Sequence, residues 1–306
     1  MAETPAASFA IPDPAARTAT LSSQSLRRAA QVVWGDGAAR AALAFLAVLV
    51  LSALLAPLVA PHDPVRPLDA VTLRGVGPSP AHWFGTDLLS RDVFSRMVYG
   101  TRVSLAVSVL AALLAAVVGL CYGGVAGLAG GRVDAVMMRV VDALLAMPRV
   151  LLLLTVLSLW PRVDTLALVL VLGLTGWFAV ARLARGEAAA LRSREFVVAA
   201  RALGSSPTRV FVRHVLPHLA GPVLVAATIA MGHVVVLEAG LSYLGVGIPE
   251  PTPTWGNIIR DGRETIASTW WLTLFPGLAL VATALATNTL ADRLRSALNP
   301  RQLPAP

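Results

Sequence analysis

The sequence predicts an all-α integral membrane protein with about six transmembrane helices, and three observations support this prediction. The 306-residue chain is 56% hydrophobic and only 14% charged, whereas soluble domains are about 45–50% apolar and about 25% charged. Its apolar residues gather in blocks close to the roughly 20 residues that cross a hydrocarbon core. The blocks are continuous rather than alternating, which favours helices over a β-barrel.

The blocks divide the chain into a tail, a first span, a long loop and a core. Residues 1–37 are polar and predict a cytoplasmic tail, because a cleavable signal peptide would begin nearer the terminus. Residues 38–60 predict the first transmembrane helix, which prolines then end. Residues 61–102 predict an extracytoplasmic segment. Within 103–302, five further spans are predicted at 103–128, 141–160, 165–183, 215–239 and 270–290.

The charged residues indicate an orientation. The net charge is +8, and every basic residue is Arg. The Arg residues lie mainly beside apolar spans, which favours membrane topology over a nucleic-acid partner. Placing the N-terminus inside gives the inner segments about twice as many Arg residues as the outer ones. The bias predicts that both termini are cytoplasmic.

The cysteine and histidine residues limit which disulfides and metal sites the chain can form. Cys121 is the only cysteine, so an intramolecular disulfide and a cysteine metal cluster are excluded. Its small, apolar neighbours predict a buried packing residue. The His residues are scattered along the sequence, and no metal-ligand cluster is expected.

The segment between the fourth and fifth spans predicts a helix, a sharp turn and a second helix. Residues 194–202 suit a short helix, and Gly204 suits the left-handed position that ends one. Ser206 offers an N-cap, with Pro207 at the first position of the next helix, which Pro217 carries into the fifth span.

Two interpretations of this inner segment stay open on physical grounds. Ala199 and Ala200 leave room for another surface to approach the first helix, and Arg201, Arg209 and Arg213 surround it with positive charge. A compact basic element of this kind suits docking of a partner protein. An interfacial loop whose Arg residues meet anionic lipid headgroups explains the same pattern.

Several motifs resemble one family. The run VAARALG at 198–204, followed by nine residues and HVLP at 214–217, resembles the "EAA" loop of ATP-binding-cassette (ABC) importer permeases, with Val198 in place of Glu and His214 in place of Ile. The runs HWFGTDLLSRDVFSRMVYGTRVSL (82–105) and EAGLSYLGVGIPEPTPTWGN (238–257) resemble the dipeptide, oligopeptide and nickel permeases. The tail, with FPGL at 275–278 and DRLRSALNPR at 292–301, is similar as well. The likeness covers residues 38–302 and is greater to the C-type partner of the two unlike permeases.

The resemblance implies a type I ABC importer permease in the cytoplasmic membrane, with 103–302 as the permease core. Such a subunit forms a heterodimer with a second permease, binds two ATPase subunits and receives cargo from an extracytoplasmic solute-binding protein. The cargo is a di- or oligopeptide, with nickel or another small solute as the alternative. The implied ATPase-docking residues, on a coupling helix and its flank, are Glu195, Ala199, Ala200, Arg201, Gly204, Leu216 and Pro217.

The chain itself carries no recognisable catalytic group. No Walker-type phosphate loop occurs in the sequence, so ATP and Mg²⁺ are expected on the partner chains and this subunit is expected to be non-catalytic. A stand-alone secondary transporter would favour an inverted repeat, and a membrane enzyme would need a convergent catalytic set. The sequence shows neither an inverted repeat nor such a catalytic set.

Ionisable residues inside the spans are candidates for the translocation path. Asp142 and Arg149 lie seven residues apart, on one face of a continuous third span, with Pro148 expected to kink it. His233 lies in the fifth span. The alternative for each is an interhelical pairing, and for Arg149 also a side chain that extends along the helix to the membrane interface. Glu238 is expected to be solvated at the outer end of the fifth span.

The outer segments hold the last candidates. Asp87, Arg91, Asp92 and Trp255 are predicted to contact the solute-binding protein or to form a lid, and the alternative is a packed, ion-paired loop. Trp255, Trp270 and Trp271 fit anchors at the membrane interface.

Overall fold

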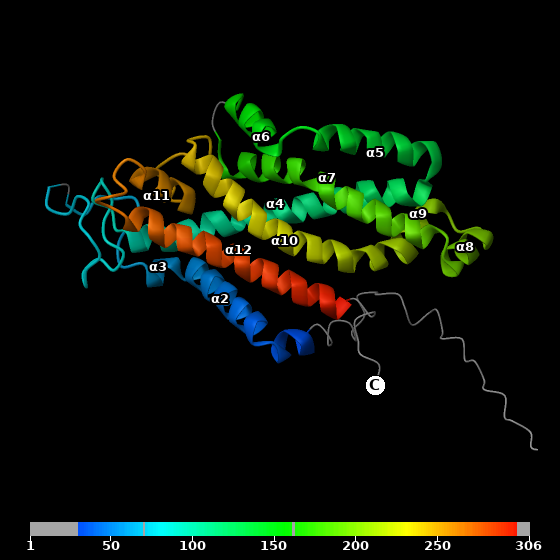
Figure 1. Ribbon diagram of the computed structural model, residues 1–306, viewed down its shortest axis with the longest axis horizontal. Coiled ribbons are helices and arrows are strands. Elements are labelled where there is room, and N and C mark those ends of the chain that lie inside the picture. The colour runs from blue at the N-terminus through cyan, green and yellow to red at the C-terminus, as the bar shows by residue number, and fades with distance from the viewer. Residues whose placement is uncertain (1–29, 70, 161–162, 299–306) are drawn as a thin grey trace, which may run out of the picture.

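The computed structural model describes residues 30–69, 71–160 and 163–298, and these form a long helical bundle (Figure 1). The long helices run along the molecule, with α8 and α9 at one end and the loop after α3 together with α11 at the other. The elements are α2 (Gly37–Leu54), α3 (Ala56–Val59), α4 (Val93–Ala129), α5 (Gly131–Leu145), α6 (Arg149–Ser158), α7 (Thr165–Arg192), α8 (Glu195–Ala202), α9 (Pro207–Val210), the π-helix η2 (Phe211–Val215), α10 (Leu216–Tyr243), α11 (Trp255–Gly262) and α12 (Trp271–Leu298).

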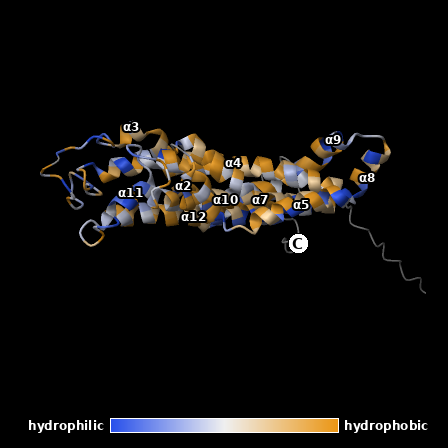
Figure 2. Cartoon of the chain, turned by 90° about the horizontal axis from the view of Figure 1, so that it is seen from above, coloured by the Kyte–Doolittle hydropathy of each residue, from blue (hydrophilic) through white to orange (hydrophobic). Residues whose placement is uncertain are grey.

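The number of spans agrees with the prediction. Among the described residues, five helical segments are long and apolar enough to cross a membrane, and counting the bent pair α5–α6 as one span gives six. Hydrophobic residues cover the length of the bundle, while hydrophilic ones gather towards its ends (Figure 2). The second span begins at Val93, ten residues earlier than predicted, because Asp92 caps the helix by accepting from the Ser95 amide. Residues 1–29 of the predicted tail lie outside the described residues.

The third span is broken, so the expectation of one continuous helix was wrong. The axes of α5 and α6 differ by 80°. Pro148 lies at this break, where it has no amide hydrogen to donate and its ring crowds the carbonyl one turn earlier. Asp142 and Arg149 therefore lie on different helices rather than on one face.

The tightest helix contact lies between α4 and α7. Gly119, Gly123 and Gly127 form a stripe on α4, with the spacing that lets transmembrane helices approach closely. A Cβ atom at Gly123 would lie only 2.7 Å from the carbonyl carbon of Ala181 on α7. Cys121 lies off this stripe and is exposed, so the prediction of a buried cysteine was wrong.

Two of the three predicted tryptophan anchors are interior residues. Trp255 is fully buried and Trp271 is 5% exposed. Their indole nitrogens donate to the carbonyl oxygens of Met97 (3.3 Å) and Thr86 (3.0 Å). Of the three predicted anchors, Trp270 alone is exposed, at 46%, as a residue at a membrane interface would be. The buried pair instead joins α11 and α12 to the start of α4 and the loop before it.

Candidate functional site

A sharp turn after α8 sets the geometry of the segment between the fourth and fifth spans. The Ser205 amide donates to the Ala200 carbonyl and the Gly204 amide to the Arg201 carbonyl, both at 3.0 Å. Gly204 has φ of +79°, so the helix ends in a Schellman motif. Ser206 caps α9 through the Arg209 amide, with Pro207 following. The predicted helix, glycine turn and second helix are confirmed as structure.

The helix α8 has one buried and one open face. Val197 and Ala200 point into a hydrophobic cluster, whereas Ala199 is exposed. Val198 and Leu203 are 53% and 85% exposed. Ala199 and Ala200 were both expected to leave room for an approaching surface. Only Ala199 of the two is accessible for this, because Ala200 faces the core. The open face carries Glu195 in its first turn and is otherwise apolar, with Val198, Ala199 and Ala202 exposed. No element among the described residues covers it.

The buried face joins α8 to three spans. Its cluster includes Leu128 at the end of α4, Ala188 on α7 and Leu219 on α10. In addition, a guanidinium nitrogen of Arg201 donates to the Leu128 carbonyl at 3.3 Å. Glu195 and Arg201 lie in the first and last turns of α8, the positions that the helix dipole favours for each sign of charge. A displacement of α8 would therefore also move the parts of α4, α7 and α10 that pack against it.

Leu216 and Pro217 are part of a different feature. They begin α10 and are half-buried, directly after the π-helix η2. Pro217 cannot donate to the carbonyl one turn earlier, so the preceding residues adopt wider π-type bonding. These two residues set the angle between the loop and the fifth span instead of adding to the open face of α8.

At the opposite end of the bundle, a buried ion network ties the loop before α4 to α11. Asp87, Arg91 and Arg96 are at most 4% exposed. The Arg91 Nε atom donates to Asp87 at 2.6 Å, and Arg96 also donates to Asp87. Both arginines reach Asp261 on α11, at 3.2 Å and 2.8 Å. Glu250 accepts from Arg91 at 3.3 Å.

The two outermost carboxyl groups of this network respond differently to it. Burial pushes the pKa of Glu250 upward, but the adjacent Arg91 and Arg96 charges outweigh burial and hold that pKa below its ordinary value. Burial raises the pKa of Asp261 above its ordinary value, although Arg96 opposes the shift. The negative charge of Glu250 adds to the rise at Asp261.

Comparison with known proteins identifies the family. Residues 119–303 match the model of the binding-protein-dependent transport system inner membrane components. The chain is 38% identical over 265 residues to the dipeptide transport system permease protein DppC of Bacillus subtilis (strain 168), covering 86% of this chain and 82% of that protein. It is 34% identical over 261 residues to the oligopeptide transport system permease protein OppC of the same organism, covering 85% and 84%.

The chain belongs to this family of transport-system membrane components. It is therefore a membrane-embedded, multi-pass transport permease. The resemblance of its loops to the dipeptide and oligopeptide permeases is confirmed by these relatives.

The outer residues predicted to touch a binding protein are all interior in this permease. Asp87, Arg91, Asp92 and Trp255 are between 0% and 4% exposed, as the alternative of a packed, ion-paired loop expects. Asp92 does not pair with Arg91 or Arg96. Glu250 and Asp261 were missed as partners because they lie more than 150 residues away along the chain.

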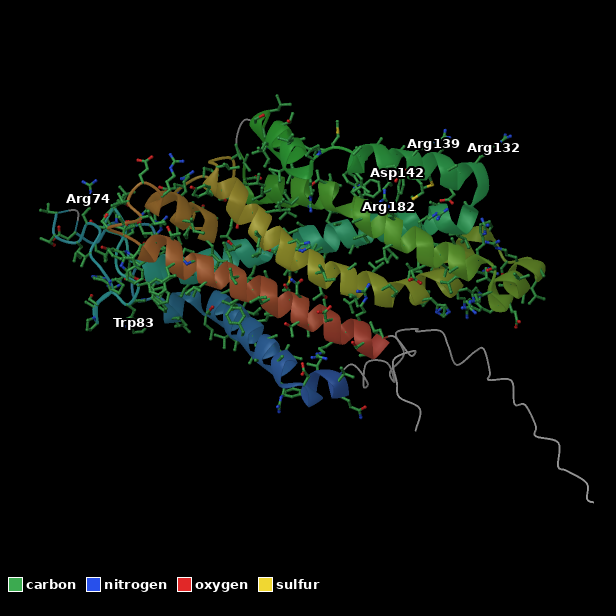
Figure 3. The ribbon with its side chains drawn as sticks, in the orientation of Figure 1. Arg74, Trp83, Arg132, Arg139, Asp142 and Arg182 are labelled. Atoms are coloured by element: carbon green, nitrogen blue, oxygen red, sulfur yellow. The ribbon has the colours of Figure 1, made fainter. Side chains whose placement is uncertain are left out.

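Two of the three candidate side chains inside the spans, those of Asp142 and Arg149, have partners on another helix. Asp142 pairs with Arg182 on α7 at 2.5 Å, and both side chains are 58% exposed (Figure 3). Arg149 donates from Nη2 to the Leu172 carbonyl at 3.0 Å, while its buried Nε has no partner among the described residues. His233 is exposed on α10. The structure does not bring Asp142, Arg149 and His233 together.

Glu238 was expected to be solvated, and that expectation was wrong. It is fully buried in α10. One carboxyl oxygen accepts from Ser104 on α4 at 3.0 Å and the other from Ser242 at 2.9 Å. The sequence gave no signal of the bond between Glu238 and Ser104, because α4 and α10 are far apart along the chain. Glu238 links the second and fifth spans.

No cluster of metal-ligating side chains was expected, but the structure brings three such side chains together. His62, His82 and Asp92 each bring one potential metal-ligand atom to within 4.8 Å of the others. The three residues are ten or more positions apart in sequence, which hid the grouping.

Proposed function

We propose that this chain is one permease subunit of an ABC importer that carries di- and oligopeptides across the cytoplasmic membrane. It would pair with a second, unlike permease and work with two ATPases and an extracytoplasmic solute-binding protein. The observation that carries the proposal is α8, whose open, mostly apolar face is followed by a defined glycine turn while its other face packs against three spans. The printed names of the relatives support the peptide cargo.

The proposed orientation places α8 and both termini in the cytoplasm. The start of α2 and the end of α12 are joined by Asp36 and Arg293 at 2.9 Å, so the first and last spans meet at one level. The end of the bundle that carries α8 lies opposite the loop after α3 (Figure 1). The Arg bias of the sequence supports an inner location for α8.

The proposed mechanism is mechanical. An ATPase subunit covers the open face of α8 and buries Val198 and Leu203, which gives a hydrophobic contact. When the ATPases close on ATP and Mg²⁺, they move α8. Because Val197 and Ala200 are packed against residues of α4, α7 and α10, the displacement passes to those spans. This chain contributes no group to ATP hydrolysis.

The cargo path in this proposal is shared with the second permease. Arg149 is its best candidate lining residue, because its guanidinium is partly buried and one nitrogen is unpaired among the described residues. A cation at that depth would meet a peptide carboxylate. The break at Pro148 places Arg149 at the start of α6.

The test is purification of the complex through a tag on this chain, followed by reconstitution into vesicles. The proposal expects a nucleotide-hydrolysing companion and ATP-dependent peptide accumulation. Leu203→Glu should reduce the amount of ATPase that stays bound, because it puts a charge on the open face of α8. Val71→Glu is the matched control, because Val71 is 88% exposed in the loop after α3. A complex without an ATPase, or equal retention in both variants, would overturn the proposal.

A further inference from the structure

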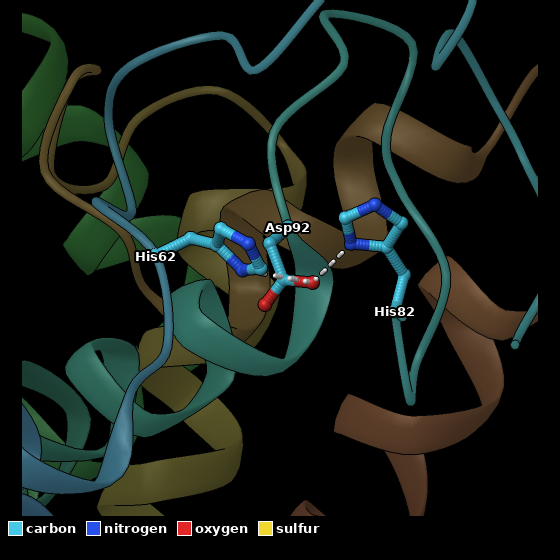
Figure 4. Close-up of side chains that lie close together, drawn as sticks. All are labelled: His62, His82 and Asp92. Atoms are coloured by element: carbon cyan, nitrogen blue, oxygen red, sulfur yellow. Dashed lines mark hydrogen bonds and ion pairs between the residues drawn. The ribbon is translucent and has the colours of Figure 1, made fainter. Parts of the chain in front are cut away.

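Three side chains from three separate segments meet beside the start of α4. His62 follows α3, His82 lies in the loop between α3 and α4, and Asp92 is the N-cap of α4. Figure 4 shows the Asp92 carboxyl group between the two imidazole rings. Its Oδ1 atom lies 3.1 Å from Nδ1 of His82 and 3.8 Å from Nδ1 of His62.

The two carboxyl oxygens of Asp92 have separate roles. Oδ2 accepts from the Ser95 amide at 2.8 Å and from the Ser95 hydroxyl at 2.7 Å, which holds the carboxylate at the start of α4. Oδ1 is left facing both rings. The Ser95 hydroxyl also accepts from the His62 amide at 3.2 Å. One serine therefore positions both Asp92 and the backbone of His62, as supporting groups do around metal ligands.

The His62 ring is the observation that points to a ligand. Its Nδ1 atom is buried and has no hydrogen-bond partner among the described residues. An unpaired buried nitrogen is unfavourable, and such cases call for an explanation. Neutral imidazole nitrogen is a common metal ligand, and a cation between the three groups would satisfy this atom.

The spacing fits a small tetrahedral cation. Ligand atoms at about 2.0–2.1 Å from a tetrahedral zinc ion are roughly 3.3 Å from one another. The two imidazole nitrogens lie 3.1 Å and 3.8 Å from Asp92 Oδ1. The three ligand atoms all lie within 4.8 Å of one another, so the His62 ring has to move towards both Asp92 and His82 to bring every separation to that spacing. The side chain of His62 is 30% exposed, which leaves room for such a shift.

We propose that His62, His82 and Asp92 bind a divalent transition-metal cation of the Zn²⁺ class. Two imidazoles and one carboxylate suit Zn²⁺ better than Mg²⁺ or Ca²⁺, which prefer oxygen ligands. Water completes the fourth position from an adjoining cavity of about 160 Å³. That cavity is lined by Pro61, Pro80, Ala81, Trp83, Asp92 and Phe94.

The cation would fasten the ends of two spans to the loop between them. His62 is joined through α3 to the first span, and Asp92 begins the second. The site is separate from the ion network, whose central carboxylate is Asp87. Binding therefore stiffens the segment between α3 and α4 without altering the arginine pairs that join it to α11.

The experiment uses the full chain in its purified complex, with an affinity tag that contains no histidine. After dialysis against Zn²⁺ and then against metal-free buffer, elemental analysis should find about one Zn²⁺ per chain. Added Zn²⁺ should raise the melting temperature of the metal-free complex. Co²⁺ in place of Zn²⁺ should give the visible absorption bands of a tetrahedral site.

His62→Gln and His82→Gln should each abolish the bound Zn²⁺ and the Co²⁺ bands. His233→Gln is the matched control, because His233 is an exposed residue on α10 away from the cluster, and it should retain the metal. His62→Gln leaves the Asp92 cap and the His82 contact intact, so a folding defect does not confound it. Metal-free wild-type complex after this treatment, or equal Zn²⁺ content in His62→Gln and wild type, would overturn the proposal.

Discussion

The turn at Gly204 offers a graded test of the α8 docking element. Its φ of +79° is unfavourable for other residues, and a Cβ atom there would meet nothing within 4 Å in this chain. Substitution therefore acts through backbone conformation rather than crowding. A residue other than glycine costs roughly 1–2 kcal/mol in this region, with Asn less affected. That range corresponds to a factor of roughly 5–30 in the population of the native turn.

The variants Gly204→Asn, Gly204→Ala and Gly204→Val should weaken ATPase binding in that order, from least to most. We expect a loss of at least about fivefold for Ala, in line with the population change. The assay is titration of the purified ATPase partner onto the permease in lipid discs, together with peptide uptake in vesicles. Membrane insertion should be unchanged. Wild-type binding in Gly204→Val would show that the left-handed turn is not needed for docking. A loss that follows side-chain volume, with Asn worse than Ala, would show that crowding rather than backbone conformation causes the effect.

Three further predictions concern packing, pH and cargo. Gly123→Val should lower the melting temperature of the complex, because overpacking the α4–α7 contact costs about 1–3 kcal/mol, whereas Gly186→Ala, with open space around its Cβ, should not. The lowered pKa of Glu250 means that its ionised form stabilises the fold above its ordinary pKa, and this stability is lost as pH falls through the folded-state value. Glu250→Gln should therefore show a flatter fall in melting temperature on acidification than wild type, and identical slopes would count against the ion network. Arg149→Ala should reduce uptake of anionic peptides more than neutral ones, and an equal loss would indicate a structural role.

Local features were predictable because short-range rules determine them. Gly204, Ser206 and Pro207 end one helix and begin the next within a few residues, and the structure reproduces that pattern. The number of spans followed from apolar block length alone. Pro148 was expected to disturb the third span, but composition cannot distinguish a kink from the 80° break that occurs.

Long-range pairings were not predictable from one sequence. Asp87 and Arg91 are four residues apart, and their ion pair follows from spacing. Asp261 joins them only because α11 folds back against α4. Burial of Trp255 and Glu238 likewise depends on how α4, α10 and α11 pack, which hydropathy does not reveal. Cys121 was misassigned because its face of α4 is opposite to the glycine stripe.

Cross-linking at the open face of α8 tests whether an ATPase subunit docks there. In a Cys121→Ser background, Ala199→Cys supplies a single thiol on that face, and Val71→Cys supplies one in the loop after α3. A short linker that reacts with a thiol at one end and a lysine amine at the other should join the Ala199→Cys permease to the ATPase companion and leave the Val71→Cys permease unlinked. Cross-linking of Val71→Cys to the ATPase, with none at Ala199→Cys, would contradict the account.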